Sequence, residues 1–409
     1  MADICWLCVL LAGIAVYLLT QFIRFVFADA DLTLLWAARF GNKPESKLKG
    51  KVVWITGASS GIGEEMSYQL AAFGARLVLS ARRENELERV KHTCLERSSL
   101  KAEDILVLPL DLLDRASHQE KTATALKHFG DIDVLINNGG RTQRSLCIEA
   151  DVDVYQALME LNYLGTISVT KQVLPHMIRR GSGIIATVSS VAGFVGAPLA
   201  TGYAASKHAV QGFFNSLRTE LTDYPNITIS TICPGPVISS IVQSAFTEEL
   251  GKPVDTAGDQ THKMSTERCV HLTLVGLANH VKEMWIAEQP FLLFCYLWQY
   301  TPTLAWYLTN VLGKKRVQNF KAGLDADSAY FSKPKVKMGR GSPIPPILRR
   351  KMVEQYQKGV SQRKTAKSLK LSSSTVHNII QRFRESVTIS VFKGQGRKTI
   401  LDACDLRAL

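Results

Sequence analysis

The chain has 409 residues, of which 46% are hydrophobic and 21% are charged, and its formal net charge is +13 at pH 7. This composition excludes a disordered or collagen-like protein, and the length suffices for a full hydrophobic core plus additional segments. The charge is uneven, because residues 338–409 hold 15 Lys and Arg against 4 Asp and Glu, a net charge of +11. Only +2 is left for the first 337 residues, so the basic character belongs to the tail.

An uncharged apolar stretch of nineteen residues, Cys5–Ile23, lies near the N-terminus. A helix of about this length crosses a bilayer core, so we expect residues 1–27 to form one transmembrane helix that anchors the chain to a membrane. A cleaved signal peptide is the alternative, since Ala28-Asp29-Ala30 resembles a cleavage site. Against cleavage, the residues before the apolar run include no Lys or Arg, and the run is long for a signal peptide. Basic residues from Arg24 to Lys51 favour a cytosolic position for the rest of the chain.

Short β-branched apolar runs alternate with helical patterns after a connector over residues 28–48. This alternation predicts a parallel sheet with crossover helices, and continuous apolar runs are typical of strands covered on both faces. We therefore predict an α/β fold with a Rossmann-type, doubly wound parallel sheet over residues 49–337. The expected strands cover residues 52–56, 76–81, 105–110, 134–137, 183–190 and 227–234.

A second apolar and aromatic stretch, Phe291–Leu312, is interrupted by Pro302, which argues against one continuous span. Three interpretations stay open: the stretch caps an apolar substrate pocket, dips into the membrane surface, or forms a core helix. The eight cysteines have neither metal nor disulfide spacing. We predict buried free thiols and no metal site.

The sequence TGASSGIG, from Thr56 to Gly63, lies where the first strand ends and a helix begins. Gly57 permits a tight turn, Gly61 lets the backbone approach a phosphate, and Gly63 lets helix and strand pack closely. The helix N-terminus offers free N–H groups and the positive end of the helix dipole to a pyrophosphate. The loop therefore predicts a dinucleotide-binding site.

The end of the second strand selects the dinucleotide. NAD-binding proteins place a carboxylate there to hold the ribose 2′-hydroxyl, whereas this chain has Ser80-Ala81-Arg82-Arg83. Arg82 and Arg83 can hold a 2′-phosphate by charge-assisted hydrogen bonds, so we predict NADP(H) as the cofactor. A solvated basic helix start is the alternative. Asp111, which closes the third strand, is expected either to accept a hydrogen bond from the adenine amino group or to cap the next turn.

Tyr203 and Lys207 lie four residues apart in YAASK, on one face of a helix. The ordinary pKa of tyrosine is about 10, and the Lys207 ammonium is expected to favour the tyrosinate and to hold the ribose hydroxyls of the nicotinamide half. Tyr203 would give a proton to a carbonyl oxygen as hydride arrives, or remove it in reverse. Ser190 is expected to hydrogen-bond the substrate oxygen. Asn162 is expected to hold a proton-relaying water or to have a structural role.

The combination of these motifs resembles the short-chain dehydrogenase/reductase family over about residues 50–330. The match consists of TGASSGIG, the NNGG run at Asn137–Gly140, Asn162, Ser190, Tyr203–Lys207 and Pro234-Gly235. NNGG departs from the usual NNAG of the family, and we expect the extra glycine to loosen that turn slightly. The resemblance places Ser239 where the family often has a threonine that touches the nicotinamide amide. It implies a catalytic domain over residues 49–337.

The resemblance assigns site residues position by position. The implied catalytic residues are Ser190, Tyr203, Lys207 and Asn162. The implied cofactor-binding residues are Thr56, Gly57, Ser59, Ser60, Gly61, Ile62, Gly63, Arg82, Arg83, Asp111, Asn138, Tyr203, Lys207, Pro234, Gly235, Val237 and Ser239.

The N-terminal anchor and the segments LVLSARR, YAASKHAV, CPGPV and GLDADSAYF narrow the resemblance to endoplasmic reticulum membrane members of the family. It implies NADPH-dependent reduction of hydrophobic carbonyls such as steroids, retinal, quinones or xenobiotics. It also implies a homo-oligomer, whose assembly a membrane anchor would restrict. Some membrane relatives face the lumen, which conflicts with the charge pattern. Asn226-Ile227-Thr228 is a glycosylation sequon that could report which side the domain occupies.

After a Pro- and Gly-rich linker at residues 338–346, a new helical pattern covers residues 347–409. Helices are expected over residues 347–359, 362–370 and 373–385, the second capped by Ser361. The apolar stripe of the third consists of Val376, Ile379, Ile380 and Phe383. This pattern and the basic run at 393–398 resemble the helix-turn-helix module of Tc1/mariner-type transposases. A DNA-binding fusion protein is therefore the alternative function, and a tail without a selected role is the other interpretation.

Overall fold

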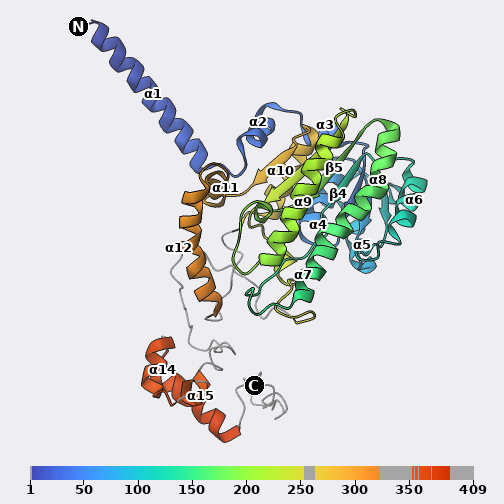
Figure 1. Ribbon diagram of the computed structural model, residues 1–409. Coiled ribbons are helices and arrows are strands. Elements are labelled where there is room, and N and C mark those ends of the chain that lie inside the picture. Colours follow the sequence, from blue (N-terminus) through green and yellow to red (C-terminus); the bar gives the residue numbers. More distant parts are fainter. Residues whose placement is uncertain are drawn as a thin grey trace. The chain divides into compact units, whose positions relative to one another are not determined.

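The computed structural model describes residues 2–252, 263–321 and 352–386, apart from 354, 358 and 370. Residue contacts divide the chain into two units, Met1–Gly313 and Lys314–Leu409. The first unit contains a seven-stranded parallel sheet with helices on both faces (Figure 1). The predicted α/β, Rossmann-type doubly wound fold is confirmed. The linker at 338–346 and the basic run at 393–398 lie outside the described residues.

The strands follow the order β3-β2-β1-β4-β5-β6-β7 across the sheet. They are β1 (Val52–Thr56), β2 (Arg76–Ser80), β3 (Ile105–Val107), β4 (Val134–Asn137), β5 (Gly183–Val188), β6 (Ile227–Pro234) and β7 (Glu283–Ile286). Three expected strands, 76–81, 105–110 and 183–190, end earlier than predicted. Strand β3 ends at Val107, although Leu108 N and Leu110 N still donate to the carbonyl oxygens of Leu79 and Ala81, both at 3.0 Å. The edge strand β7 was not expected, because EMWI is short and begins with a charged residue.

Helices cover the two faces of the sheet. One layer contains α4 (Gly61–Ala72), α5 (Glu84–Glu96) and α10 (Thr266–Ala278), and the other contains α6 (His118–Phe129), α8 (Thr166–Arg180) and α9 (Thr201–Glu220). The strand alternation explains this, since Val53 and Ile55 of β1 pack in the first layer, whereas Val52 and Trp54 pack in the second. A short helix, α7 (Val152–Met159), packs on α9 and continues into a π-helical turn, Glu160–Gly165.

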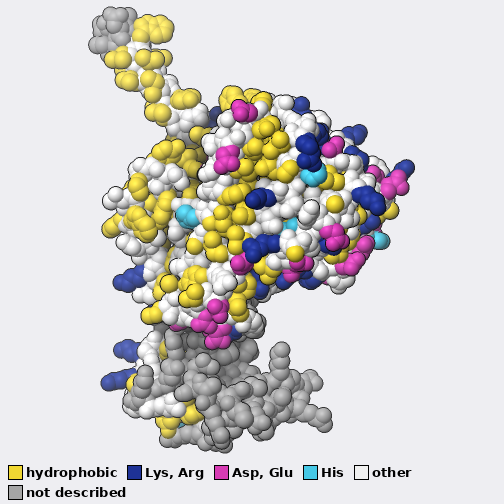
Figure 2. All heavy atoms as spheres, turned by 45° about the vertical axis from the view of Figure 1, so that its right-hand side comes forward, with side chains coloured by type: hydrophobic (Ala, Val, Ile, Leu, Met, Phe, Trp, Pro, Cys, Tyr) yellow, Lys and Arg dark blue, Asp and Glu magenta, His cyan; other side chains and the backbone are white. Residues whose placement is uncertain are grey.

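The N-terminal helix α1 (Ala2–Val26) is long and apolar enough to cross a membrane. Its segment Trp6–Val26 has a mean hydropathy of 2.1, and none of that segment is buried. Figure 2 shows hydrophobic side chains along this projecting helix. The expected connector over 28–48 contains α2 (Leu32–Phe40) and α3 (Pro44–Leu48), and Ala30 forms an antiparallel bridge with Ile286 of β7.

The apolar stretch after residue 290 forms two helices, α11 (Phe291–Tyr300) and α12 (Pro302–Lys321), and Pro302 begins the second. The predicted interruption is confirmed. Only Ala305 is buried within α12, while Trp306 and Tyr307 are 54% and 67% exposed. The interpretation of this second half as a core helix is therefore wrong.

In the second unit, the helices expected over 362–370 and 373–385 are α14 (Gln362–Leu369) and α15 (Ser373–Ser386). Ser361 Oγ accepts a hydrogen bond from Lys364 N at 3.4 Å, as expected for a helix cap. Val376 and Ile380 are buried in a small apolar cluster with Met352 and Ala366. The helix expected over 347–359 falls partly outside the described residues.

Candidate active site

The glycine loop connects β1 to α4 and has the conformation that its glycines allow. Gly57 and Gly61 have φ angles of +68° and +58°, in the left-handed region that favours glycine. A Cβ atom on Gly63 would lie 2.3 Å from the Gly57 carbonyl oxygen, so only glycine permits this approach. Ser60 precedes the helix without a side-chain capping bond. The first N–H groups of α4 can therefore bind an anion, as predicted for a pyrophosphate.

Asn138 holds the end of β4 against this loop. Its Nδ2 donates to the carbonyl oxygens of Thr56 and Gly57, both at 3.1 Å, and its backbone N–H donates to Thr56 Oγ1 at 3.0 Å. The NNGG run also makes room for a neighbour, because a Cβ on Gly139 would lie 2.7 Å from Leu112 Cδ1. The space left by the glycine is thus filled by Leu112, and the looser turn that we expected is not what the packing indicates.

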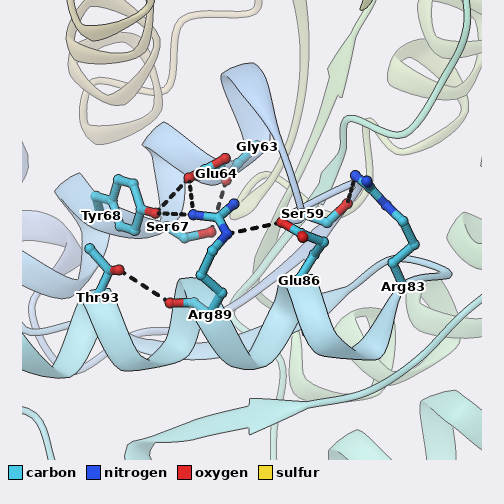
Figure 3. Close-up of polar contacts among 9 residues, drawn as sticks. All are labelled: Ser59, Gly63, Glu64, Ser67, Tyr68, Arg83, Glu86, Arg89 and Thr93. Carbon is cyan, nitrogen blue, oxygen red and sulfur yellow. Dashed lines mark hydrogen bonds and ion pairs between the residues drawn. The ribbon is translucent and has the colours of Figure 1, made fainter. Parts of the chain in front are cut away.

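Arg82 and Arg83 follow the end of β2, close to the glycine loop. Arg83 Nη2 donates to the hydroxyl of the buried Ser59 at 3.4 Å (Figure 3). Among the ion pairs of the described residues, none includes Arg83. The Arg82 charge is felt at Arg141, whose pKa is lowered first by burial and then by that charge. Arg82 and Arg83 therefore place positive charge beside the glycine loop, at the end of β2.

Glu64, an acidic residue close to Arg83, is already ion-paired with another residue. Glu64, in the first turn of α4, accepts from Arg89 Nη1 at 2.8 Å and from the Tyr68 hydroxyl at 2.6 Å (Figure 3). Arg89 Nε also donates to Glu86 at 2.9 Å. Burial raises the pKa of Glu64, but the Arg89 and Tyr68 hydrogen bonds and the charges of Arg89 and Arg83 lower it by more. Glu64 is thus an ionised carboxylate that Arg89 holds.

Asp111 caps a turn. Its Oδ1 accepts from the backbone N–H of Leu113 at 3.0 Å, and its carbonyl oxygen lies 3.1 Å from Nε2 of the buried His118. The capping alternative that the sequence left open is therefore realised. The contact of Asp111 with adenine stays a prediction.

Ser190, Tyr203 and Lys207 are brought together by β5 and α9. Lys207 is buried, its Nζ donates to the Val188 carbonyl oxygen at 2.8 Å, and the same Nζ lies 5.8 Å from the centroid of the Tyr203 ring. Ser190 Oγ accepts from Ala192 N at 3.1 Å and donates to the Pro234 carbonyl oxygen at 3.3 Å, and the nearby Ser190 hydroxyl lowers the pKa of Tyr203. The arrangement can present a phenol and a serine hydroxyl to one oxygen atom.

Burial dominates the acid–base properties of this group. Burial raises the pKa of Tyr203, while the Ser190 hydrogen bond and the charge of Arg144 act in the opposite direction. Burial lowers the pKa of Lys207 to about 8. The charge of Arg144 also lowers the pKa of Tyr203, and the expected role of Lys207 in favouring the tyrosinate stays a prediction. Arg144 gave no signal in the sequence, because its loop approaches the start of α9 only in the folded chain, through Gln143 Oε1 and the N–H of Gly202 at 2.7 Å.

Asn162 lies in the π-helical turn and is fully engaged in structural bonds. Its Nδ2 donates to the Arg141 carbonyl oxygen and to Ser206 Oγ, both at 2.9 Å, and its Oδ1 accepts from Arg141 N at 2.9 Å. Both amide hydrogens are used, which favours the structural alternative for the side chain. Because Ser206 precedes Lys207, Asn162 braces the turn of α9 that carries the lysine. Its role with a relaying water stays a prediction.

The segment after β6 covers the glycine loop. A Cβ on Gly61 would lie 3.3 Å from Ser239 Cβ, so the predicted nicotinamide contact residue adjoins the N-terminus of α4. Gly235 packs against Ala287. A Cβ atom on Gly235 would lie only 2.8 Å from the Ala287 Cβ, so the position requires glycine. Val237 forms a parallel bridge with Met264. The predicted cofactor-binding residues between Pro234 and Ser239 therefore lie where the carboxyl end of β6 approaches the glycine loop.

Comparison with known proteins identifies the family. A family model described as short chain dehydrogenase matches residues 51–250. The chain is 59% identical over 332 residues to dehydrogenase/reductase SDR family member 7 of Homo sapiens, covering 81% of this chain and 97% of that protein. The chain belongs to the short-chain dehydrogenase/reductase family. It is therefore an oxidoreductase of this family, and the expectation drawn from its motifs is confirmed.

Two solved short-chain dehydrogenase/reductase structures show the shared fold. An alcohol dehydrogenase from Thermococcus sibiricus complexed with 5-hydroxy-NADP is 25% identical, with a TM-score of 0.51, and covers 58% of this chain and 97% of its own. A short-chain dehydrogenase/reductase from Burkholderia phymatum in complex with NAD is 21% identical, with a TM-score of 0.54, and covers 70% and 99%. Nicotinamide cofactors are therefore bound by proteins of this fold, in both the phosphorylated and the unphosphorylated form.

Proposed function

We propose that the protein is an NADP-dependent oxidoreductase that transfers a hydride between the nicotinamide cofactor and a hydrophobic carbonyl or alcohol of the steroid, retinoid, quinone or xenobiotic type. The observation that carries this proposal is the meeting of Ser190, Tyr203 and Lys207 beside the glycine loop. The loop fits a dinucleotide, because Gly57 and Gly61 have left-handed backbones and the first N–H groups of α4 are not capped by Ser60.

In this mechanism the chain supplies the proton and holds the substrate. The bound nicotinamide supplies or accepts the hydride. Ser190 and Tyr203 both bind the carbonyl oxygen, and the Tyr203 hydroxyl gives its proton to that oxygen as the carbonyl carbon is reduced. The burial that raises the pKa of Tyr203 keeps the phenol protonated, which suits reduction. In the oxidative direction the tyrosinate removes the proton from the alcohol.

Preference for NADP is supported by Arg83 and Ser59, which would hold the 2′-phosphate with Arg82. An arginine that is hydrogen-bonded to a serine but has no carboxylate partner among the described ion pairs can accept a phosphate without first breaking an ion pair. The alcohol dehydrogenase relative complexed with 5-hydroxy-NADP is consistent with this preference. The relative in complex with NAD is too distant to argue against it.

We further propose that α1 anchors the enzyme in the endoplasmic reticulum membrane. The domain limits that we propose are the anchor 1–27, the connector 28–48, the catalytic domain 49–337, the linker 338–346 and the basic tail 347–409. Asn226 of the sequon is exposed. A glycosidase-sensitive glycan on Asn226 would therefore contradict the cytosolic orientation that the basic residues favour. DNA binding by the tail gains no support from the relatives and stays a prediction.

The function is tested with the full-length protein in membranes, by measuring NADPH oxidation against steroid, retinal and quinone carbonyls. Tyr203→Phe should reduce turnover about 10²- to 10⁴-fold, the usual contribution of a general acid, while NADPH binding persists. Tyr224→Phe, at an exposed tyrosine, is the matched control and should retain full turnover. Equal turnover by Tyr203→Phe and the unaltered enzyme would refute the assignment, and equal use of NADH would refute the cofactor preference.

A further inference from the structure

The outer face of α2 exposes a stripe of large hydrophobic side chains. Leu32, Trp36 and Phe40 are 67%, 68% and 65% exposed, and their spacing of four residues places them on one side of the helix. The rings of Trp36 and Phe40 lie 4.5 Å apart. The opposite face, with Leu34 and Ala37 buried, already packs into the core. The stripe is therefore not needed to attach α2 to the domain, and an exposed apolar patch of this kind indicates a binding surface.

The chain before α2 is fixed to the edge of the sheet. Asp31 N donates to the Trp285 carbonyl oxygen at 2.9 Å, and Ala287 N donates to the Asp29 carbonyl oxygen at 3.0 Å. The Asp31 carboxylate accepts from Trp285 N at 2.8 Å and from Leu34 N at 3.0 Å. Arg268 forms an ion pair with Asp29 at 2.7 Å. The exposed stripe is consequently presented in one orientation relative to β7.

The same stretch places α2 close to the end of the anchor. Five residues separate Val26 from Leu32, so even a fully extended chain keeps these two residues within about 22 Å of each other. The last turn of α1 also contacts α11, since Gln289 Nε2 donates to the Phe25 carbonyl oxygen at 2.9 Å and the rings of Phe25 and Tyr296 lie 5.9 Å apart. The stripe therefore cannot lie far from the membrane that α1 crosses.

The residues beside the stripe are those that favour a bilayer interface. Tryptophan is enriched at the level of the headgroups, where its ring meets both acyl chains and water. The guanidinium carbon of Arg39 lies 5.6 Å from the Phe40 ring centroid, and Lys43 and Lys47, which follow in the chain, are exposed. Their positive charges complement anionic lipid headgroups.

We propose that the outer face of α2 lies in the headgroup region of the bilayer that α1 spans, as a second membrane contact. This proposal rests on the proposed anchoring by α1. It commits to lipid over protein as the occupant, because the tether keeps the stripe near the membrane and because Trp36 and Arg39 suit its interface. With two contacts, the catalytic domain is held in one orientation on the membrane and does not swing on its anchor.

The experiment uses the full chain in nanodiscs and measures tryptophan quenching by phospholipids brominated near the headgroup end of the acyl chains. Trp36 should be quenched, so Trp36→Phe should remove part of the bromolipid-dependent quenching. The matched control carries His92→Trp together with Trp36→Phe. His92 is exposed on α5, which packs against β2 and β3 at the opposite edge of the sheet. That edge is about 29 Å from β7, at about 4.8 Å per strand, so the new tryptophan should not be quenched.

A further variant separates this proposal from the anchor. Trp6 lies in the apolar segment of α1, and Trp6→Phe should remove the part of the quenching that reports the span. If Trp6→Phe lowers quenching but Trp36→Phe does not, the anchor stands and the proposal for α2 is overturned. Absence of bromolipid quenching in the unaltered protein would overturn both. Shielding of Trp36 from aqueous iodide without bromolipid quenching would show that protein covers the stripe, which also overturns the proposal. Retained NADPH binding in each variant confirms folding.

Discussion

Lys207 Nζ donates a hydrogen bond to the carbonyl oxygen of Val188 at 2.8 Å. The bond ties α9 to the last residue of β5, two positions before Ser190 leaves the sheet. It holds an ammonium in a buried position where the charged form has lost its hydration, and this burial lowers the pKa of Lys207 to about 8. The lysine that organises the candidate site is thus expected to reduce the stability of the free protein.

Replacing this lysine should change how stability depends on pH. Below pH 8 Lys207 is protonated in both the folded and the unfolded chain, so the cost of burying its charge is fully present. Between pH 8 and the ordinary value of 10.5, the unfolded chain binds the proton and the folded chain does not, so this cost disappears as pH rises. The unfolding free energy of the unaltered protein should therefore rise by about 2.5 kcal/mol relative to Lys207→Met between pH 7 and 10.

This prediction is checked by urea unfolding of both proteins across that pH range. Lys171→Met removes an exposed lysine on α8 and serves as the control, which should follow the unaltered protein at every pH. A constant difference between Lys207→Met and the unaltered protein would show that Lys207 keeps its ordinary pKa.

Arg144 should tune the pH profile of the reaction. Its positive charge lowers the pKa of Tyr203, so Arg144→Met should raise that pKa further. Because alcohol oxidation requires the tyrosinate, its rate profile should move to higher pH, while carbonyl reduction should persist to higher pH than before. The measurement is the pH dependence of kcat/KM in both directions. Arg179→Met, at an exposed arginine on α8, should leave both profiles in place, and an unmoved profile for Arg144→Met would refute the role.

Arg83 should distinguish the two cofactors. Loss of a charge-assisted contact with the 2′-phosphate costs about 1.5–3 kcal/mol, so Arg83→Ala should weaken NADPH binding about 10- to 150-fold and leave NADH binding nearly unchanged. Dissociation constants for the two cofactors, measured by fluorescence titration, test this directly. Lys91→Ala removes a charge from α5, the helix that follows Arg83, and should alter neither constant. Equal weakening of both cofactors would mean that Arg83 only supports the loop through Ser59.

Arg89 should support the preference for NADPH over NADH indirectly, through its ion pair with Glu64. In Arg89→Ala, Glu64 loses its 2.8 Å ion pair and becomes an unpaired carboxylate whose charge is felt at Arg83. We expect severalfold weaker NADPH binding with little change for NADH, because the freed carboxylate competes with the phosphate for Arg83. Adding Glu64→Gln should restore NADPH affinity, which distinguishes this effect from simple loss of packing. If the double variant binds NADPH as weakly as Arg89→Ala, Glu64 is not the cause.

The features that could be predicted from the sequence are those encoded by neighbouring residues. The left-handed turn of Gly57 and Gly61 follows from local backbone sterics. Tyr203 and Lys207 share a face because helices repeat every 3.6 residues. Strands β1, β4 and β6 were predicted with their observed bounds, since apolar β-branched runs between turn residues are local signals. The tight approach of Gly63 to Gly57 was also predictable, because both residues belong to one turn.

Contacts between distant segments were decided by the tertiary structure alone. Asn162 pairs with Arg141 and Ser206, and Leu112 fills the space at Gly139. The residues that neighbour Asn162 and Gly139 in the sequence do not indicate these partners. Arg144 reaches the environment of Tyr203 only because its loop returns to the start of α9. The sequence by itself thus determined the family, six of the seven strands and the candidate catalytic residues. Only folding decided the pKa values and the pairing of Ala30 with β7, because burial and cross-sheet hydrogen bonds depend on segments far apart in the chain.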